Sequence, residues 1–142
     1  MGKSYECRAA SFENSKKKQV KKKTGMKNFK NLMVWQKSMD VVDRTFDIID
    51  AMDRTTQFVL ASQIGRSAVS VPSNISEGSG RNSSKDFARF LDIAIGSSFE
   101  LETQLIICQR RKSLKECGID GTLEQLMEVQ KMLFGLLKKV RE

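Results

Sequence analysis

The sequence predicts an all-α protein, and three observations lead to that class. Its 142 residues include only nine glycines and one proline, so few residues interrupt regular structure. Apolar residues recur three and four positions apart over long stretches, which is the period of an amphipathic helix, whereas no stretch alternates like a strand. The length suits one domain that buries its own core without disulfides or metal. We therefore predict an antiparallel, up-down-up-down four-helix bundle over residues 28–142, because short connections join successive helices.

The first helix is expected over about residues 34–52. Its apolar stripe repeats at helical spacing and consists of Trp35, Met39, Val42, Phe46 and Ile49. Aspartates follow the same rhythm on another face, which we call the acidic edge: Asp40, Asp43, Asp47 and Asp50. The simpler interpretation of this edge is a solvated face. The alternative is contact with a basic surface of a neighbouring subunit.

The second helix is expected to begin at a capping threonine, Thr55 or Thr56. Its predicted core stripe consists of Phe58, Ala61, Ile64, Ala68, Val71 and Ile75. This stripe would face the first helix and the rest of the bundle.

The only proline of the chain, Pro72, lies inside that second helix. It has no N–H for the carbonyl of Ala68, so we expect a kink, with Asn74 and neighbouring serines satisfying freed backbone groups. Gly78 and Gly80 are expected to end the helix, one of them in the left-handed conformation.

The third helix is predicted to begin after Ser83, whose hydroxyl is placed to cap it. Its apolar face consists of Phe87, Phe90, Leu91, Ala94, Leu101, Leu105 and Cys108. Gly96 lies in mid-helix, where glycine costs about 1 kcal/mol relative to alanine. Close packing of another helix is expected to compensate for that cost.

Residues 112–121 are expected to form a turn, after which Thr122-Leu123-Glu124-Gln125 opens the fourth helix as a capping box. The buried face of this helix is expected to contain Leu123, Leu126, Met127, Leu133, Leu137 and Val140. Further apolar residues lie partly off that face: Met132, Phe134 and Leu136. This surplus predicts a second packing surface, since a helix in a monomeric bundle buries one face.

The net charge of +8 is concentrated near the N-terminus. Residues 1–28 hold nine Lys and Arg against two Glu, whereas the remainder holds sixteen basic against fifteen acidic residues. Six of the basic residues form two triplets: Lys16, Lys17, Lys18, Lys21, Lys22 and Lys23. We expect residues 1–27 to be a disordered basic arm, because they have too few apolar side chains to offset the entropy of ordering. As a functional element the arm would contact phosphates; otherwise it is a solvated tail.

The residue types disfavour an enzyme. The chain has no histidine, which removes the commonest general base and every Ser-His or Cys-His nucleophile pair. Cys7, Cys108 and Cys117 lack metal-ligand spacing, so they are expected to be free thiols in a reducing cytoplasm. We predict no catalytic site, metal or cofactor, and no membrane segment, because no apolar run is long enough to span a bilayer.

Two places are candidate binding sites. Glu77 and Arg81 flank the glycine-rich corner; an ion pair is the ordinary interpretation. The sharper interpretation is a phosphate at the start of the third helix, held by Arg81 and Lys85. Arg66 is the second candidate: it either crosses to the acidic edge of its own or a neighbouring chain, or is a surface arginine.

Three runs closely resemble one protein family: residues 34–37 (VWQK), 69–78 (VSVPSNISEG) and 90–97 (FLDIAIGS). They contain the residues assigned to its structural motif, Trp35, Pro72, Asn74, Glu77, Gly78 and Gly96. The family consists of four-helix-bundle proteins encoded in intervening sequences of bacterial large-subunit ribosomal RNA genes, and the resemblance covers about residues 26–140. It implies a homopentamer with heterologous contacts and a link to structured RNA. The fold is also similar to the accessory protein of diversity-generating retroelements, which binds nucleic acid and a reverse transcriptase.

Two departures from the resemblance bear on function. Gly65 stands where the family often has the first arginine of an Arg-Arg pair, and the near-neutral bundle is unlike the basic retroelement protein. Because Met26 resembles a typical family start, residues 1–25 are either a genuine arm or a leader translated from an upstream start. The sequence thus predicts an RNA-associated oligomer that is not an enzyme; the alternative is a protein–protein scaffold, for example an accessory subunit of a reverse transcriptase.

Overall fold

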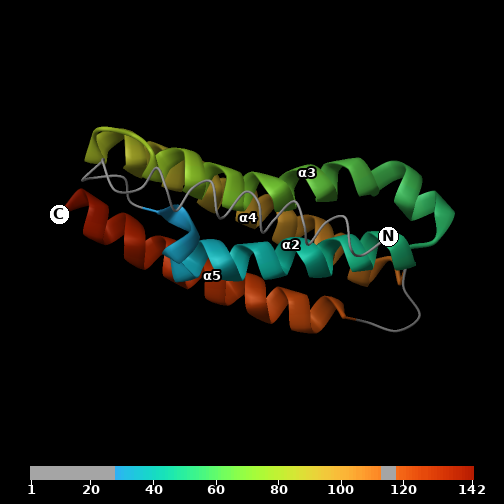
Figure 1. Ribbon diagram of the computed structural model, residues 1–142. Helices are drawn as coiled ribbons and strands as arrows, with labels where there is room; N and C mark the ends of the chain where they lie inside the picture. The colour runs from blue at the N-terminus through green and yellow to red at the C-terminus, as the bar shows by residue number, and fades with distance from the viewer. Residues whose placement is uncertain (1–27, 113–117) are drawn as a thin grey trace, which may run out of the picture.

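A computed structural model describes residues 28–112 and 118–142. These residues form four α-helices and no strand, so the predicted all-α class is confirmed (Figure 1). A short 3₁₀ turn, η2 (Phe29–Asn31), precedes α2 (Met33–Ala51), α3 (Arg54–Ser79), α4 (Ser84–Arg110) and α5 (Ile119–Arg141). The predicted basic arm, with Cys7 and the lysine triplets, lies outside the described residues, as does Cys117.

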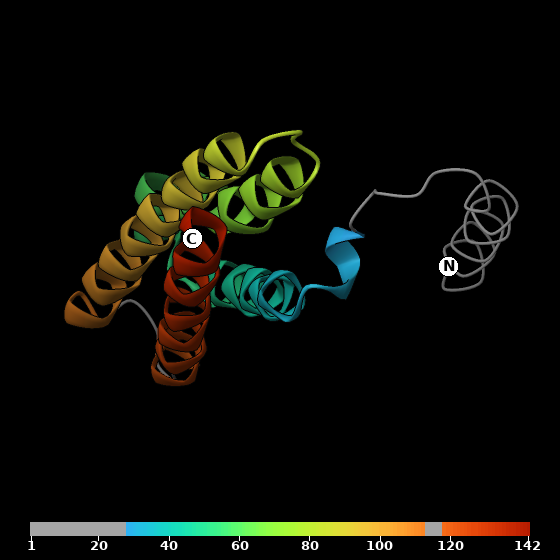
Figure 2. The same ribbon diagram turned by 90° about the vertical axis from the view of Figure 1, so that its left-hand side faces the viewer.

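The chain reverses direction after each helix, so neighbouring helices run antiparallel (Figure 1). Each helix packs against the next, and α2 also packs against α5, which closes the bundle. Figure 2 shows that α4 and α5 diverge toward one end. The core lies between these four helices.

The buried stripe of α2 differs from the predicted one. It consists of Val34, Ser38, Val41, Val42, Thr45, Ile48 and Ile49, whereas the predicted core residues Met39 and Phe46 are exposed. Trp35 is partly buried and packs its ring edge against Phe29, with centroids 5.3 Å apart. Ser38 and Thr45 fit the core because their hydroxyls donate to carbonyls of their own helix, at 2.7 and 2.6 Å. Because serine and threonine are polar, the apolar pattern of the sequence did not mark these two positions as buried.

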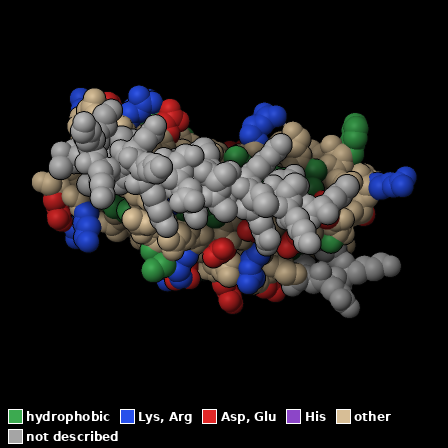
Figure 3. All heavy atoms as spheres, viewed as in Figure 1, with side chains coloured by type: hydrophobic (Ala, Val, Ile, Leu, Met, Phe, Trp, Pro, Cys, Tyr) green, Lys and Arg blue, Asp and Glu red, His purple; other side chains and the backbone are tan. Residues whose placement is uncertain are grey.

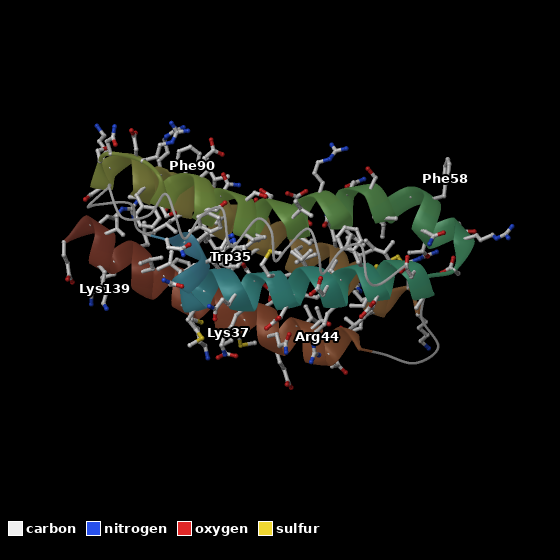
Figure 4. All side chains as sticks on the ribbon, in the orientation of Figure 1. Trp35, Lys37, Arg44, Phe58, Phe90 and Lys139 are labelled. Carbon is white, nitrogen blue, oxygen red and sulfur yellow. The ribbon has the colours of Figure 1, made fainter. Side chains whose placement is uncertain are left out.

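The start of α3 corrects two predictions. Asp53, not a threonine, caps the helix: its carboxylate accepts from the backbone N–H of Thr56 at 2.9 Å. This hydrogen bond, reinforced by the Thr56 hydroxyl, lowers the pKa of Asp53 from its ordinary value of 3.8. Phe58 is 91% exposed rather than buried, because the first turn of α3 extends beyond the packed part of the bundle (Figure 4). The later core residues of the stripe are buried as predicted: Ile64, Ala68, Val71 and Ile75.

The end of α3 depends on a close approach rather than on an unusual backbone. The helix continues past the buried Pro72 to Ser79, and Asn74 donates to the Ser70 carbonyl at 2.7 Å. The expected left-handed glycine is absent: Gly80 has φ −85°, and Gly78 is helical. Gly78 is instead buried against α4, where an added Cβ would lie 2.6 Å from the Cβ of Phe90.

Helix α4 follows its prediction closely, with one exception. Ser83 caps it by accepting from the N–H of Asp86 at 3.1 Å, and all seven residues of the predicted apolar face are buried. Gly96, however, is exposed, and an added Cβ there would meet no atom within 4 Å. At the next residue α4 contacts α3 through a hydrogen bond between the hydroxyls of Ser97 and Ser70, at 2.8 Å.

Helix α5 begins one turn before the predicted capping box. Ile119 is fully buried and Thr122 lies inside the helix, where its hydroxyl donates to the Gly118 carbonyl at 2.7 Å. The buried residues are Ile119, Thr122, Leu126, Val129, Gln130, Leu133 and Leu137. Met127, predicted to be buried, is exposed, as is Phe134.

Candidate nucleic-acid interface

Exposed cations gather at one end of the bundle, which we call the basic end. The α3–α4 corner and the last turn of α5 lie together there, as the two views of the ribbon show (Figures 1 and 2). The exposed cations at this end are Arg81, Lys85, Arg89, Lys138, Lys139 and Arg141. Figure 3 shows Lys and Arg side chains projecting where α3 ends. A surface of this kind suits phosphate groups spaced along a polyanion.

The α3–α4 corner holds two arginines in defined positions. Arg81 pairs with Glu77 four residues earlier, with Nη2 and Oε1 2.9 Å apart and both side chains about half exposed. Its guanidinium carbon lies 4.8 Å from the centroid of the Phe90 ring, and Arg89 lies at the same distance from that ring. An exposed pair of this kind contributes about 0.3–0.5 kcal/mol. The Phe90 ring also attracts both guanidinium groups, which holds the two cations beside the same ring.

A hollow of about 540 Å³ lies between the start of α4 and the end of α5. Its charged lining consists of three cations, Lys85, Arg89 and Arg141, and two carboxylates, Asp86 and Asp92. Arg141 donates to Asp92 at 2.6 Å, which leaves Lys85 and Arg89 as the cations without an ion pair among the described residues. Asp86 occupies the first turn of α4, where its charge already complements the helix dipole. The arrangement therefore suits an extended phosphate backbone better than one phosphate bound at the helix start.

Arg66 does not belong to this end. It lies about 20 Å from Ser79, the last residue of α3, at 1.5 Å per residue. Its side chain contacts the Ser62 hydroxyl at 3.4 Å, and it forms no ion pair with the described acidic edge. It borders an apolar hollow beside Phe46 and Val69 instead. The structure thus unites two of the predicted bundle cations, Arg81 and Lys85, and separates the third.

The sequence-based prediction missed four cations of the basic end: Arg89, Lys138, Lys139 and Arg141. Three of them lie in the last turn of α5, which a search for cations near helix C-termini would have found. Their proximity to Arg81 and Lys85 is a property of the antiparallel fold. The six predicted arm lysines lie outside the described residues.

The acidic edge of α2 is exposed along its whole length, as its spacing predicts. The ion pairs among the described residues are Lys37–Glu128, Arg81–Glu77 and Arg141–Asp92, so none involves these aspartates. Figure 4 shows Lys37 and Arg44 on the α2 side that faces α5. The acidic edge and the basic end therefore form separate surfaces.

Two other kinds of site, a metal centre and a membrane-spanning helix, are not found among residues 28–112 and 118–142. There, no group of three or more His, Cys, Asp or Glu residues is arranged to hold a metal ion. None of the described helices combines the length and the apolar character that crossing a bilayer requires. Cys108 is fully buried between helices.

Comparison with known proteins points to one family. Residues 30–135 match the family described as 23S rRNA-intervening sequence protein. The fold is similar to a crystal structure of a protein of unknown function from the S23 ribosomal protein family of Bacteroides thetaiotaomicron VPI-5482, with 26% identity and a TM-score of 0.69. That similarity covers 75% of this chain and 99% of the Bacteroides chain. No curated protein matches the sequence.

Proposed function

The chain belongs to the 23S rRNA-intervening sequence protein family, and on this premise we propose that it is an oligomeric four-helix bundle, not an enzyme, that associates with structured RNA in the cytoplasm. The observation that carries the RNA part is the basic end, where six exposed cations lie among four carboxylates, Glu77, Asp86, Asp92 and Glu142. The rest of the domain is close to neutral. Phosphate contacts would therefore concentrate at one end of the bundle rather than spread over it.

The basic end and the N-terminal lysines would act together. Each phosphate neutralised by Lys or Arg releases counterions, so binding should weaken steeply as salt rises. The arm would supply contacts that do not depend on RNA sequence, whereas the Arg81–Phe90–Arg89 cluster would supply contacts at fixed spacing. The oligomeric part, a homopentamer by the family resemblance, would place several basic ends on one assembly. Such repetition raises avidity without new contacts.

A protein–protein scaffold, for example an accessory subunit of a reverse transcriptase, is the second candidate. The unpaired acidic edge and the exposed Phe46 on α2 favour it. The two functions respond to salt in opposite ways: phosphate binding weakens, whereas apolar docking holds or strengthens.

Fluorescence anisotropy of a labelled structured RNA at two salt concentrations tests the proposal. We expect Lys85→Gln, Arg89→Gln and Lys139→Gln, combined in the full chain, to reduce binding and to lower the log–log salt slope by roughly 2–3. The matched control removes three exposed cations from the opposite end, through Arg54→Gln, Arg110→Gln and Arg111→Gln.

Equal losses in the two variants would contradict a localised interface and indicate a general charge effect. A third variant, with the six arm lysines changed to glutamine, separates arm from bundle. If it alone abolishes binding, RNA contact belongs to the arm and the bundle is a scaffold.

A further inference from the structure

Two helices carry exposed stripes with the same spacing and opposite charge. The α2 stripe consists of Met39, Asp43, Phe46 and Asp50; the α5 stripe consists of Met127, Lys131, Phe134 and Lys138. In both, steps of four, three and four residues separate Met, charge, Phe and charge. All eight side chains are exposed, and the apolar ones expose 36% (Met39), 45% (Phe46), 49% (Met127) and 50% (Phe134). Each stripe lies on one helix face, because such steps return to the same side of a helix.

The two stripes lie on different sides of the bundle. Phe46 borders α3, where it lines an apolar hollow of about 550 Å³ with Gly65 and Val69. Phe134 borders α4, where its ring centroid lies 6.2 Å from that of Phe99. One protomer therefore cannot pair its own stripes with each other.

The charged residues of both stripes lack partners within the described protomer. No ion pair among residues 28–112 and 118–142 involves Asp43, Asp50, Lys131 or Lys138. Glu128, which lies beside the α5 stripe, is neutralised by Lys37 of α2. Each stripe thus presents an uncompensated charge of one sign around exposed apolar side chains.

We propose that the α2 stripe of one copy docks on the α5 stripe of a second copy. This inference rests on the oligomeric part of the proposed function and names the surfaces that would meet. In an antiparallel arrangement Asp43 faces Lys138 and Asp50 faces Lys131, with Phe46 and Phe134 meeting between them within about one 1.5 Å helical rise. Flanking ion pairs around an apolar centre set partner and register in helix pairs.

Charge also excludes the symmetric alternatives. Docking α2 on α2 would bring aspartates together, and docking α5 on α5 would bring lysines together, so like stripes repel. Because the two stripes also lie on different sides of the bundle, they meet different neighbours, and the contact is heterologous: each copy uses one stripe toward each of two neighbours. Contacts of this kind repeat into a closed ring or an open chain.

Charge exchange in the full-length protein tests the docking. One variant carries Asp43→Lys and Asp50→Lys; a second carries Lys131→Asp and Lys138→Asp; a third carries all four changes. Sedimentation velocity is measured at equal concentration and salt, with circular dichroism confirming helix content. We expect each double variant to dissociate about tenfold or more readily than the unmodified chain, because like charges then oppose the contact.

Recovery of assembly when opposite charges are restored discriminates better than loss of assembly in the double variants. The fourfold variant should regain self-association, and so should an equimolar mixture of the two double variants, in which every contact again joins opposite charges. Because copies alternate in the mixture, closed rings there must contain an even number of chains. The control, Asp40→Lys with Glu100→Lys, has the charge change of the first variant off the stripes and should assemble like the unmodified chain.

The outcomes separate this inference from the broader proposal. Normal assembly of both double variants, or failure of both the fourfold variant and the mixture to recover, would overturn the docking while the oligomeric proposal stands. Equal dissociation of the control would also overturn it. A chain that stays monomeric throughout would remove both. RNA anisotropy on the unmodified chain judges the RNA part independently, because Lys138, changed in the second and fourfold variants, belongs to the basic end.

Discussion

Replacing Gly78 with alanine is expected to destabilise the bundle, although alanine is the better helix former. Gly78 is buried where α3 crosses α4, and an added Cβ would lie 2.6 Å from the Cβ of Phe90 and 2.9 Å from Cδ2 of Phe87. The Phe90 Cβ is fixed to its backbone and cannot rotate away. The methyl group therefore forces the two helices apart instead of displacing a side-chain tip.

The expected magnitude follows from two opposing effects. Overpacking a close contact costs about 1–3 kcal/mol. The gain in helix propensity is at most about 1 kcal/mol, and Gly78 lies in the last turn, where that gain is smaller. The net loss is about 1–2 kcal/mol, or roughly 4–8 °C in Tm for a domain of this size.

Gly96 provides the matched control, because an added Cβ there meets nothing within 4 Å. Gly96→Ala should stabilise by about 0.5–1 kcal/mol, since only the propensity gain remains. Thermal unfolding followed by circular dichroism at equal protein concentration compares the variants. A Gly78→Ala protein as stable as the Gly96→Ala protein would refute the close approach of α3 and α4 at this point.

Three further changes probe other parts of the structure. Ser67→Ala should lower the unfolding free energy by about 1–3 kcal/mol in chemical denaturation, because the Ser67 hydroxyl donates to the buried Gln104 Oε1 at 2.7 Å and that oxygen would lose its partner. A Ser67→Ala, Gln104→Leu double variant that is no more stable than Ser67→Ala alone would count against this explanation. Asp53→Ala should lower Tm most above pH 5, since the hydrogen bonds from Thr56 lower the pKa of Asp53 and its contribution is lost as pH falls through that pKa; a Tm difference that grows toward pH 3 would have the wrong sign. Phe58→Ser should change unfolding free energy by less than about 0.5 kcal/mol, because the ring is exposed; a larger loss would show that something covers it.

The sequence predicted best where local chemistry or burial on several sides determined the outcome. Ser83 was identified as a cap because its hydroxyl bonds to a backbone N–H three residues away, which involves no distant part of the chain. All seven apolar residues of α4 were identified because this helix packs against both α3 and α5, and its stripe contains only apolar residues. Both patterns can be recognised in the sequence without knowledge of the tertiary contacts.

Tertiary contacts explain the failures. The pattern at Thr122 satisfies the capping rule, but burial of Ile119 extends α5 by a turn at its N-terminus. Gly78 and Gly96 are the same residue type in helical patterns, yet only the first has a neighbouring helix against its Cα. Of the candidate site, sequence located Arg81 and Lys85, whereas their neighbours on α5 depend on how the helices fold back.

The misassigned core residues are themselves informative. Helical spacing placed Met39, Phe46 and Met127 in the core, and the structure exposes all three together with Phe134. Spacing cannot distinguish a residue buried by its own chain from one buried by a second copy, because both require the same apolar repeat on one helix face. These four residues also fall, with alternating Asp or Lys, on the two matching stripes, whereas the misplaced Phe58 of α3 does not. Burial against another copy, as proposed above, would account for both the apolar repeat and its exposure in the single chain.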